Sequence, residues 1–408
     1  MQKRLALAFC LLVFASNVQA SGLYFEARSD SMGGTGVAAS NRIGASFINP
    51  ALLSILTPHS SYSAAEIKKA QQFSLLLPVV GAEGADSDNM IDKFDSLQDS
   101  YDGLEAAINS GDSSDVEGYR DDLVIDLESL KGNRAEFSAG IGAAIVIPNE
   151  RMPMAVFYKS YLDAVGIADI AQSDIDTLNT LDPLNPPADI TDLDSQGVVL
   201  AGGVTDFGVA LSFPLSIVNM PVRVGISPKF QRIDTYHYSV NANNFDADDF
   251  DDDKYRNNEN VFNLDIGVAF EPMDELTIGL SARNLFSKTV KTVEAQGREF
   301  HYQVEPLITA GVAYDWTSVT LTTDIDLIDQ TRFKEFDAVQ YWRVGGEVKA
   351  TDWLSLRMGY RHDLKDNTVD IYSFGTGFAI GQAFKLDMSG SYGEDDAIGA
   401  VLQTSYHF

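Results

Sequence analysis

The glycine-rich stretch Ser31–Ser40 contains a spacing that matches, in outline, a cofactor-binding motif. Gly34-x-Gly36-x-x-Ala39 has the pattern with which a dinucleotide-binding domain holds a pyrophosphate. That fingerprint needs a buried strand before it and a helix after it, within a unit of parallel strands. The preceding segment, Glu26–Asp30, does not have the pattern of such a strand. We therefore expect no nucleotide cofactor at this stretch.

The densest group of carboxylates is the run Asp246–Asp253. Asp246, Asp248 and Asp251 are spaced closely enough to bind calcium. The run lacks the glycine at position six and the terminal glutamate of a helix–loop–helix calcium site. Two interpretations stay open, a solvated external loop and a loose site for a divalent cation.

No set of residues with the spacing of a catalytic site emerges. The sequence has no Gly-x-Ser-x-Gly elbow. The five histidines are scattered and form no spaced metal pair: His59, His237, His301, His362 and His407. We therefore expect a protein that is not an enzyme, with no catalytic, cofactor-binding or metal-binding residues. An enzyme that uses carboxylates of a lumen or rim remains an alternative hypothesis.

The N-terminus has the three parts of a secretory signal peptide. A basic start at Met1–Arg4 precedes the apolar stretch Leu5–Ala15, and Val18–Ala20 is a small-x-small cleavage site. We predict a signal peptide over residues 1–20. Cys10, the single cysteine of the chain, lies within it, so the mature protein has no thiol for a disulfide or a metal.

Composition excludes several functional classes. With 29 basic and 59 acidic residues, the chain has a formal net charge of -30, which argues against a nucleic-acid partner. No later stretch approaches the roughly 18 to 20 apolar residues of a membrane helix. An exported chain without a helical anchor belongs to the periplasm, the cell exterior or the outer membrane.

The last twelve residues, Ala397–Phe408, alternate between apolar and small or polar side chains. A strand places such residues on opposite faces. The stretch Val261–Phe270 alternates in the same way, with charged or polar side chains opposite the apolar ones. In a closed membrane barrel the apolar face meets lipid and the polar face meets a wet lumen. The alternative is a soluble sandwich whose apolar face is buried on a second sheet.

Strand number favours the barrel. Thirteen alternating segments follow Ala135, and one more within His59–Gly81 makes fourteen. Short turns alternate with longer links, as in outer-membrane barrels, which places both termini in the periplasm. We predict an all-β fold, a transmembrane antiparallel β-barrel of about fourteen strands over residues 58–408, located in the outer membrane.

Within residues 84–132 the apolar spacing becomes helical. Ile91, Phe94, Leu97 and Tyr101 recur at intervals of three or four, and a second such run follows Gly111. We predict an acidic helical hairpin inserted after the first strand, on the outer face of the barrel or folded over its mouth.

Gly33, Gly34 and Gly36, followed by Asn49 and Pro50, resemble the N-terminal signature of FadL-type outer-membrane transporters. The resemblance implies that residues 21–57 pack inside the barrel as a plug and that these five residues form its motif. Glycines suit such a segment because its backbone must turn tightly in a crowded lumen.

The C-terminal strand also resembles the signature, ending in Phe, by which outer-membrane barrels are handed to their assembly machinery. That resemblance implies that Tyr406 and Phe408 are an assembly signal and that the barrel-assembly machinery is a partner.

Phe25–Ser29, Phe73–Ala82 and Gln98–Asp102 bring the resemblance closer to the FadL-like group known as conjugative-transfer protein TraF, over nearly the whole mature chain. It implies a barrel in contact with outer-membrane lipid that passes or binds hydrophobic small molecules. The alternative that it implies is an envelope assembly or structural component of a conjugative plasmid-transfer system, with other transfer components as partners.

Overall fold

The computed structural model describes residues 25–54, 72–86, 89–149, 151–187, 193–217, 220–245, 253–381, 383–394 and 397–408. The predicted signal peptide lies outside the described residues. So does the acidic run, apart from Asp253.

The described chain begins with three short helical turns and continues with strands into which longer helices are inserted. The turns are α2 (Ala27–Asp30), α3 (Ala45–Ile48) and η1 (Pro50–Leu53). The longer helices are α5 (Met90–Ser110), α6 (Ser113–Leu130) and α7 (Gln172–Thr180), and two further turns are η3 (Ala242–Asn244) and η5 (Asp253–Tyr255). The strands are β1 (Ser74–Asp86), β2 (Arg134–Ile147), β3 (Met154–Asp169), β4 (Gln196–Ile217), β5 (Met220–Asn241), β6 (Arg256–Met273), β7 (Leu276–Arg283), β8 (Lys288–Lys291), β9 (His301–Val304), β10 (Leu307–Asp315), β11 (Val319–Asp326), β12 (Tyr341–Thr351), β13 (Leu354–Asp363), β14 (Ile371–Ile380), β15 (Phe384–Gly393) and β16 (Ile398–His407).

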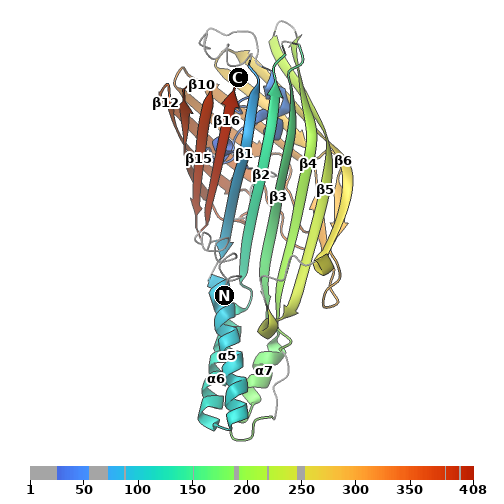
Figure 1. The fold of residues 1–408 in the computed structure, drawn as a ribbon, viewed down its shortest axis with the longest axis vertical. Coiled ribbons are helices and arrows are strands. Elements are labelled where there is room, and N and C mark those ends of the chain that lie inside the picture. The colour runs from blue at the N-terminus through green and yellow to red at the C-terminus, as the bar shows by residue number, and fades with distance from the viewer. Residues whose placement is uncertain are drawn as a thin grey trace.

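The strands close into one antiparallel barrel because β1 pairs with β16, its last strand in sequence (Figure 1). The ring runs β1-β16-β15-β14-β13-β12-β11-β10-β7-β6-β5-β4-β3-β2, while β8 and β9 form a separate two-stranded sheet. The prediction of fourteen barrel strands is confirmed, and the alternative of a soluble sandwich is wrong.

The outer surface of the barrel is apolar, as the sequence alternation predicts. In β16, Ile398, Leu402 and Tyr406 are exposed, whereas Val401 and Gln403 between them are buried. Closure leaves no open edge among the lipid-facing strands, so every backbone group can be paired within the barrel. Among the described residues, no helix is long and apolar enough to cross a membrane.

Connection length distinguishes the two ends of the barrel. Short connections join β2 to β3, β6 to β7, β10 to β11 and β12 to β13, whereas the opposite end carries the long ones. Short periplasmic turns and long external loops are the rule for outer-membrane barrels. The end that holds the C-terminus is therefore periplasmic, and the end that holds α5, α6 and α7 is external.

One side of the barrel wall is much taller than the other (Figure 1). Strands β4 and β5 have 22 residues each, whereas β16 has 10. The tall side carries α5, α6 and α7, which pack into a hydrophobic cluster of their own beyond the external end. The helical hairpin is present as predicted and extends away from the barrel, whereas α7, which lies between β3 and β4, was not predicted from the sequence.

Strand β1 differs from the prediction at its end. It continues past Gly81 because Glu83 pairs with Gly399 on one edge and Asp86 pairs with Ala135 on the other. The helical insertion therefore begins after Asp86 rather than at about Gly84. A β-bulge also interrupts both edges of β1 between Leu76 and Val80. At the bulge, Pro78 has no N–H to donate to a ladder.

The seam between β1 and β16 predicts the effect of removing the last residue. The Phe408 backbone N–H donates to Phe73 O at 3.0 Å, and the two rings stack with centroids 6.1 Å apart. Deleting Phe408 removes both contacts, so we expect severalfold less folded barrel in the outer membrane, measured by heat-modifiable migration on a gel. Phe374→Ala, which removes an exposed ring on β14 away from the seam, is the control. Unchanged levels of the truncated protein would contradict the proposed assembly signal at Tyr406 and Phe408.

Candidate functional site

The N-terminal segment, residues 25–54, lies inside the barrel and is folded into short turns (Figure 1). Glu26 caps α2, because its Oε2 accepts a hydrogen bond from Ser29 N at 2.7 Å. The chain then turns sharply at Gly33 and Gly34, whose φ angles are +73° and +86°. Glycine adopts this left-handed conformation at little cost. The predicted plug is thus confirmed as part of the fold.

The three glycines of the predicted plug motif have different surroundings. A Cβ on Gly33 would lie 2.6 Å from Tyr360 O, so this residue rests directly on the backbone of β13. A Cβ on Gly36 would lie 2.8 Å from Ile48 Cδ1, so Gly36 packs within the plug itself. The turn around these glycines therefore contacts the wall at Gly33 and another part of the plug at Gly36.

Asn49 and Pro50 sit on a different part of the wall. Asn49 Nδ2 donates to Val37 O at 2.7 Å within the plug and to Val268 O of β6 at 3.3 Å. A Cβ on Gly225 of β5 would lie 2.3 Å from the carbonyl carbon of Pro50. The motif residues therefore do not form one cluster, and the structure brings them against separate strands.

The wall receives the plug on glycines that face one another across neighbouring strands. Each pair lies under one part of the plug, and a Cβ on any of these glycines would lie within 3.1 Å of a plug atom. The pairs are Gly81 with Gly140, Gly225 with Gly267, Gly279 with Gly311, and Gly345 with Gly359. A Cβ on Gly311 would lie 2.2 Å from Asp324 Oδ1 and 3.1 Å from Val37 Cβ of the plug, so this glycine also makes room for the Asp324 carboxylate. Sequence reasoning recognised Gly267 as inward-facing but did not identify it as part of a seat.

An ion pair clamps the start of the plug to β12. Arg28 Nε donates to Glu347 Oε2 at 3.1 Å, and Arg28 NH1 donates to Ala39 O at 2.5 Å. Arg357 Nε donates to the same carboxylate at 2.5 Å, and its NH1 lies 2.8 Å from Asp387 Oδ1. All four charged side chains are buried, so removing one would leave its partners uncompensated in the interior of the barrel.

Asp324 of β11 holds the middle of the plug through the backbone. Its Oδ2 accepts hydrogen bonds from Gly36 N at 2.8 Å and from Val37 N at 2.9 Å. Hydrogen bonds to a carboxylate are stronger than those between neutral groups. This contact needs only backbone donors in the plug.

The other side of the plug is apolar. Phe47, Ile48, Leu52 and Leu53 are buried against apolar residues of the wall, and Phe47 meets Phe157 edge to face with centroids 6.3 Å apart. The wall residues in this cluster belong to β1, β2, β3, β4, β6 and β16 and include Leu76, Val79, Ala144, Val146, Ala155, Phe157, Ala210, Ala269 and Val401. The plug thus has one ionic face and one apolar face.

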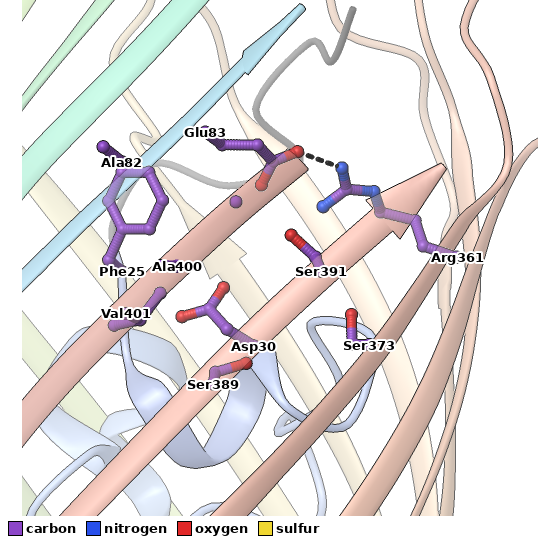
Figure 2. A pocket seen from close by; sticks show the side chains of 11 residues that line it. Phe25, Asp30, Ala82, Glu83, Arg361, Ser373, Ser389, Ser391, Ala400 and Val401 are labelled. Carbon is purple, nitrogen blue, oxygen red and sulfur yellow. Dashed lines mark hydrogen bonds and ion pairs between the residues drawn. The ribbon is translucent and has the colours of Figure 1, made fainter. Parts of the chain in front are cut away.

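A small polar cavity lies between the plug and β1, β13, β14, β15 and β16 (Figure 2). Asp30 enters it from the plug, and Arg361 of β13 pairs across it with Glu83 of β1 at 2.5 Å. Serine hydroxyls from Ser373, Ser389 and Ser391 complete the polar lining. The cavity has room for about one water molecule. Its size and polarity do not suit a hydrophobic solute.

A second ionic layer lines the inner face of the wall over the neighbouring strands β3, β4, β5 and β6, on the external side of the plug. Lys229 of β5 pairs with Asp265 at 2.9 Å and with Asp206 at 3.1 Å, and Lys159 lies 3.5 Å from the same Asp206. Lys229 Nζ also donates to Asn284 Oδ1 at 2.7 Å. All of these side chains are buried, and the four charged ones belong to four neighbouring strands, so they tie this part of the wall together from the inside.

The small sheet of β8 and β9 caps the lumen on the external side of that layer. Tyr302 is buried over Gly202 of β4, where a Cβ would lie 2.0 Å from the ring. Phe333 packs on Tyr302 with centroids 5.2 Å apart. The sequence did not predict this hairpin, because each of its strands has just four residues.

The described histidines make contacts other than metal ligation. His301 pairs with Glu335, His362 with Asp370, and His407 with the Ser74 hydroxyl. His237 Nδ1 lies 3.0 Å from Val293 O. Across the described ranges, no group of three or more metal-ligating side chains is found.

Comparisons with known proteins identify the family. A family model described as "F plasmid transfer operon, TraF, protein" matches residues 46–326, which is more than half of the chain. The chain belongs to this TraF family. A comparison with curated protein sequences finds no match.

Solved structures share the fold of this TraF-family chain. The toluene transporter TbuX of Ralstonia pickettii is 11% identical with a TM-score of 0.55, over 95% of this chain and 99% of that chain. A FadL homologue of Pseudomonas aeruginosa is 10% identical with a TM-score of 0.52, over 95% and 99%. A mutant of the monoaromatic hydrocarbon channel TodX is 10% identical with a TM-score of 0.52, over 94% and 98%. The TraF-family chain thus has the β-barrel fold of these channels.

The seat of the plug can be tested with two glycines that share a backbone conformation. Gly33 and Gly111 both have φ +73°, but a side chain on Gly33 would meet the wall, whereas nothing lies within 4 Å of a Cβ on Gly111. Replacing either by valine costs about 1–3 kcal/mol in backbone strain. We expect only Gly33→Val to displace the plug and sensitise cells to large antibiotics, with both barrels assembled at normal levels. Equal sensitivity of the two variants would show that the wall contact does not seat the plug.

Proposed function

We propose that this barrel passes small hydrophobic molecules across the outer membrane and that the N-terminal plug is its movable stopper. The observation that carries the proposal is that the plug contacts the wall in two different ways, with an ion pair to β12 on one side and apolar packing on the other. Buried ion pairs and hydrogen bonds need a fixed geometry, whereas apolar contacts are not directional and can open without a strict geometry. The apolar face is therefore the side that opens.

A route for the solute leads from this apolar face to β1. Leu76 and Val79 are buried in the same cluster as Phe47, and the bulge between them sends Leu77 and Pro78 to the outer side of the barrel. The ladder is interrupted on both edges of β1 at this place. A hydrophobic molecule that enters between Phe47 and the wall would thus reach lipid through a short gap lined by apolar side chains.

The similarity of the fold to hydrocarbon channels supports the choice of solute class. Small aromatic hydrocarbons fit the apolar cluster at the plug, where Phe47 and Phe157 already pack edge to face. The polar cavity around Asp30 and Arg361 is the less suitable route, because a hydrocarbon there would displace water from charged groups without replacing its hydrogen bonds.

A reversible tether tests this function. Ser54 Oγ of the plug lies 2.7 Å from Ser212 Oγ of β4, and the mature chain is predicted to contain no cysteine. Changing both serines to cysteine should allow a disulfide that locks the apolar side of the plug to the wall. We expect oxidation to reduce toluene entry into cells to the level of cells without the barrel, and a reductant to restore it.

The control for this experiment joins two wall strands instead. Ser160 and Thr205 are directly paired on β3 and β4 with their hydroxyl oxygens 2.8 Å apart. A disulfide between cysteines at these positions leaves the plug untouched, so toluene entry should not respond to oxidation. If the wild-type barrel gives no entry above cells without it, the transport proposal is wrong. If entry persists with the plug tethered, the plug is not the stopper.

A role in plasmid transfer is the second candidate, and membership of the TraF family favours it. The described lumen is filled by the plug, the ionic layer and the β8–β9 hairpin, which suits an envelope component that need not conduct. Deleting the gene from a donor strain should then lower the frequency of conjugative transfer by orders of magnitude. The tethered variant separates the two functions, because a structural component should support transfer when oxidised.

A further inference from the structure

Four phenylalanines form a row on the outer face of the tall wall. Phe207 of β4 pairs with Phe230 of β5, which pairs with Phe262 of β6, and Phe286 follows β7. Phe230 and Phe262 meet edge to face at 5.9 Å, and Phe262 lies 6.3 Å from Phe286. Their exposed fractions are 56%, 70%, 51% and 50% in chain order, so the row faces the surroundings of the barrel.

The outer face changes from apolar to charged directly beyond this row. Along β5 the outward residues run Val224, Ile226, Pro228 and Phe230, followed by Arg232 and Asp234. About twelve residues of tilted strand separate Met220 from Arg232, a rise of roughly 30 Å, slightly more than the ~25 Å apolar band of such barrels. Arg232 therefore lies at the external edge of the membrane.

Two arginines share one carboxylate at this edge. Arg232 Nε donates to Asp234 Oδ2 at 3.0 Å, and Arg256 NH2 donates to Asp234 Oδ1 at 2.6 Å. Arg256 is further held over the ring of Tyr236, 5.5 Å from its centroid. Within the part of the chain that the structure describes, neither arginine uses its NH1 group in a hydrogen bond. The trio has a net charge of about +1 and unused donors.

Two arginines on the outer face of the wall are unusual for a chain with a net charge of -30. The strand cations elsewhere in the barrel mostly face the lumen and pair there, as Lys229, Arg343 and Arg357 do. Arg232 and Arg256 instead face outward, with exposed side-chain fractions of 46% and 30%. A guanidinium at such a position matches a phosphate, with which it forms strong paired hydrogen bonds.

We infer that Phe207, Phe230 and Phe262, with Arg232 and Arg256, form a binding site for a phosphorylated glycolipid of the outer leaflet. The acyl chains lie along the phenylalanine row, and a phosphate bridges the two arginines. Asp234 holds both guanidiniums in position. The site lies on the outer wall, so it is independent of the transport proposed for the lumen.

Retention of a defined lipid tests the site. The full-length protein would be purified in detergent, loaded with lipid A that carries two phosphates, and examined by native mass spectrometry. We expect wild type to keep one lipid A and the double variant Arg232→Gln/Arg256→Gln to bind it about tenfold more weakly, as the loss of a charge-assisted contact predicts. Lipid A without phosphates should bind wild type as weakly as the variant binds the intact lipid.

The control variant removes the same charge from the same end of the barrel. Lys291→Gln/Arg298→Gln changes two exposed residues of the β8–β9 hairpin that pair with Glu299 and Asp169. This variant should retain lipid A as wild type does. Equal retention by the Arg232/Arg256 variant, equal loss in the control, or equal binding of lipid A without phosphates would each overturn the proposal. Because all substitutions lie on the surface, heat-modifiable migration of each variant will show that the barrel is folded.

Discussion

The whole structure depends on filling the interior of a closed barrel with a second piece of chain. A fourteen-stranded wall encloses more space than its own side chains fill, since barrels of about eight strands are already just filled. Here the plug backbone lies directly on the wall backbone, which requires that the wall have no side chains at the contact. Paired glycines such as Gly225 and Gly267 meet that requirement. Any larger residue at these positions would have to push the plug backbone away from the wall.

Charge then fixes how the plug is oriented. Arg28 on Glu347 and the Gly36 amide on Asp324 attach it to β11 and β12, while Phe47 and its neighbours rest on the apolar side. Breaking one buried ion pair costs about 3–5 kcal/mol because the remaining charge is left uncompensated. Opening the apolar side leaves no unpaired charge, and a hydrophobic solute that enters there restores the apolar contact. The asymmetry makes a plug that stays attached while one face opens, which is the property that a stopper needs.

The sequence predicted the barrel wall well because one physical rule governs it. Every lipid-facing residue must be apolar, so strands such as Val261–Phe270 carry a period-two pattern that survives without structural context. The lumen face has no such rule. Lys229, Asp265 and Gln231 look like any polar residues of a wet channel, and their partners lie on other strands. The plug motif was proposed from a resemblance to a known family. The wall glycines beneath the plug have no distinctive sequence pattern, and the β8–β9 hairpin and α7 are too short to give a clear periodicity.

The distribution of cations joins these observations. Folding places Arg28, Lys159, Lys229 and Arg357 in the lumen, where they are neutralised by acids from neighbouring strands. The helices of the external end are rich in acidic residues, in keeping with the overall charge of -30. An anionic membrane surface would repel such a protein at close range. A pair of arginines that faces outward at the lipid edge provides an attractive contact with the membrane surface. It lies on the tall side of the wall, where β3, β4 and β5 extend furthest beyond the membrane and an attachment to lipid would stabilise them most.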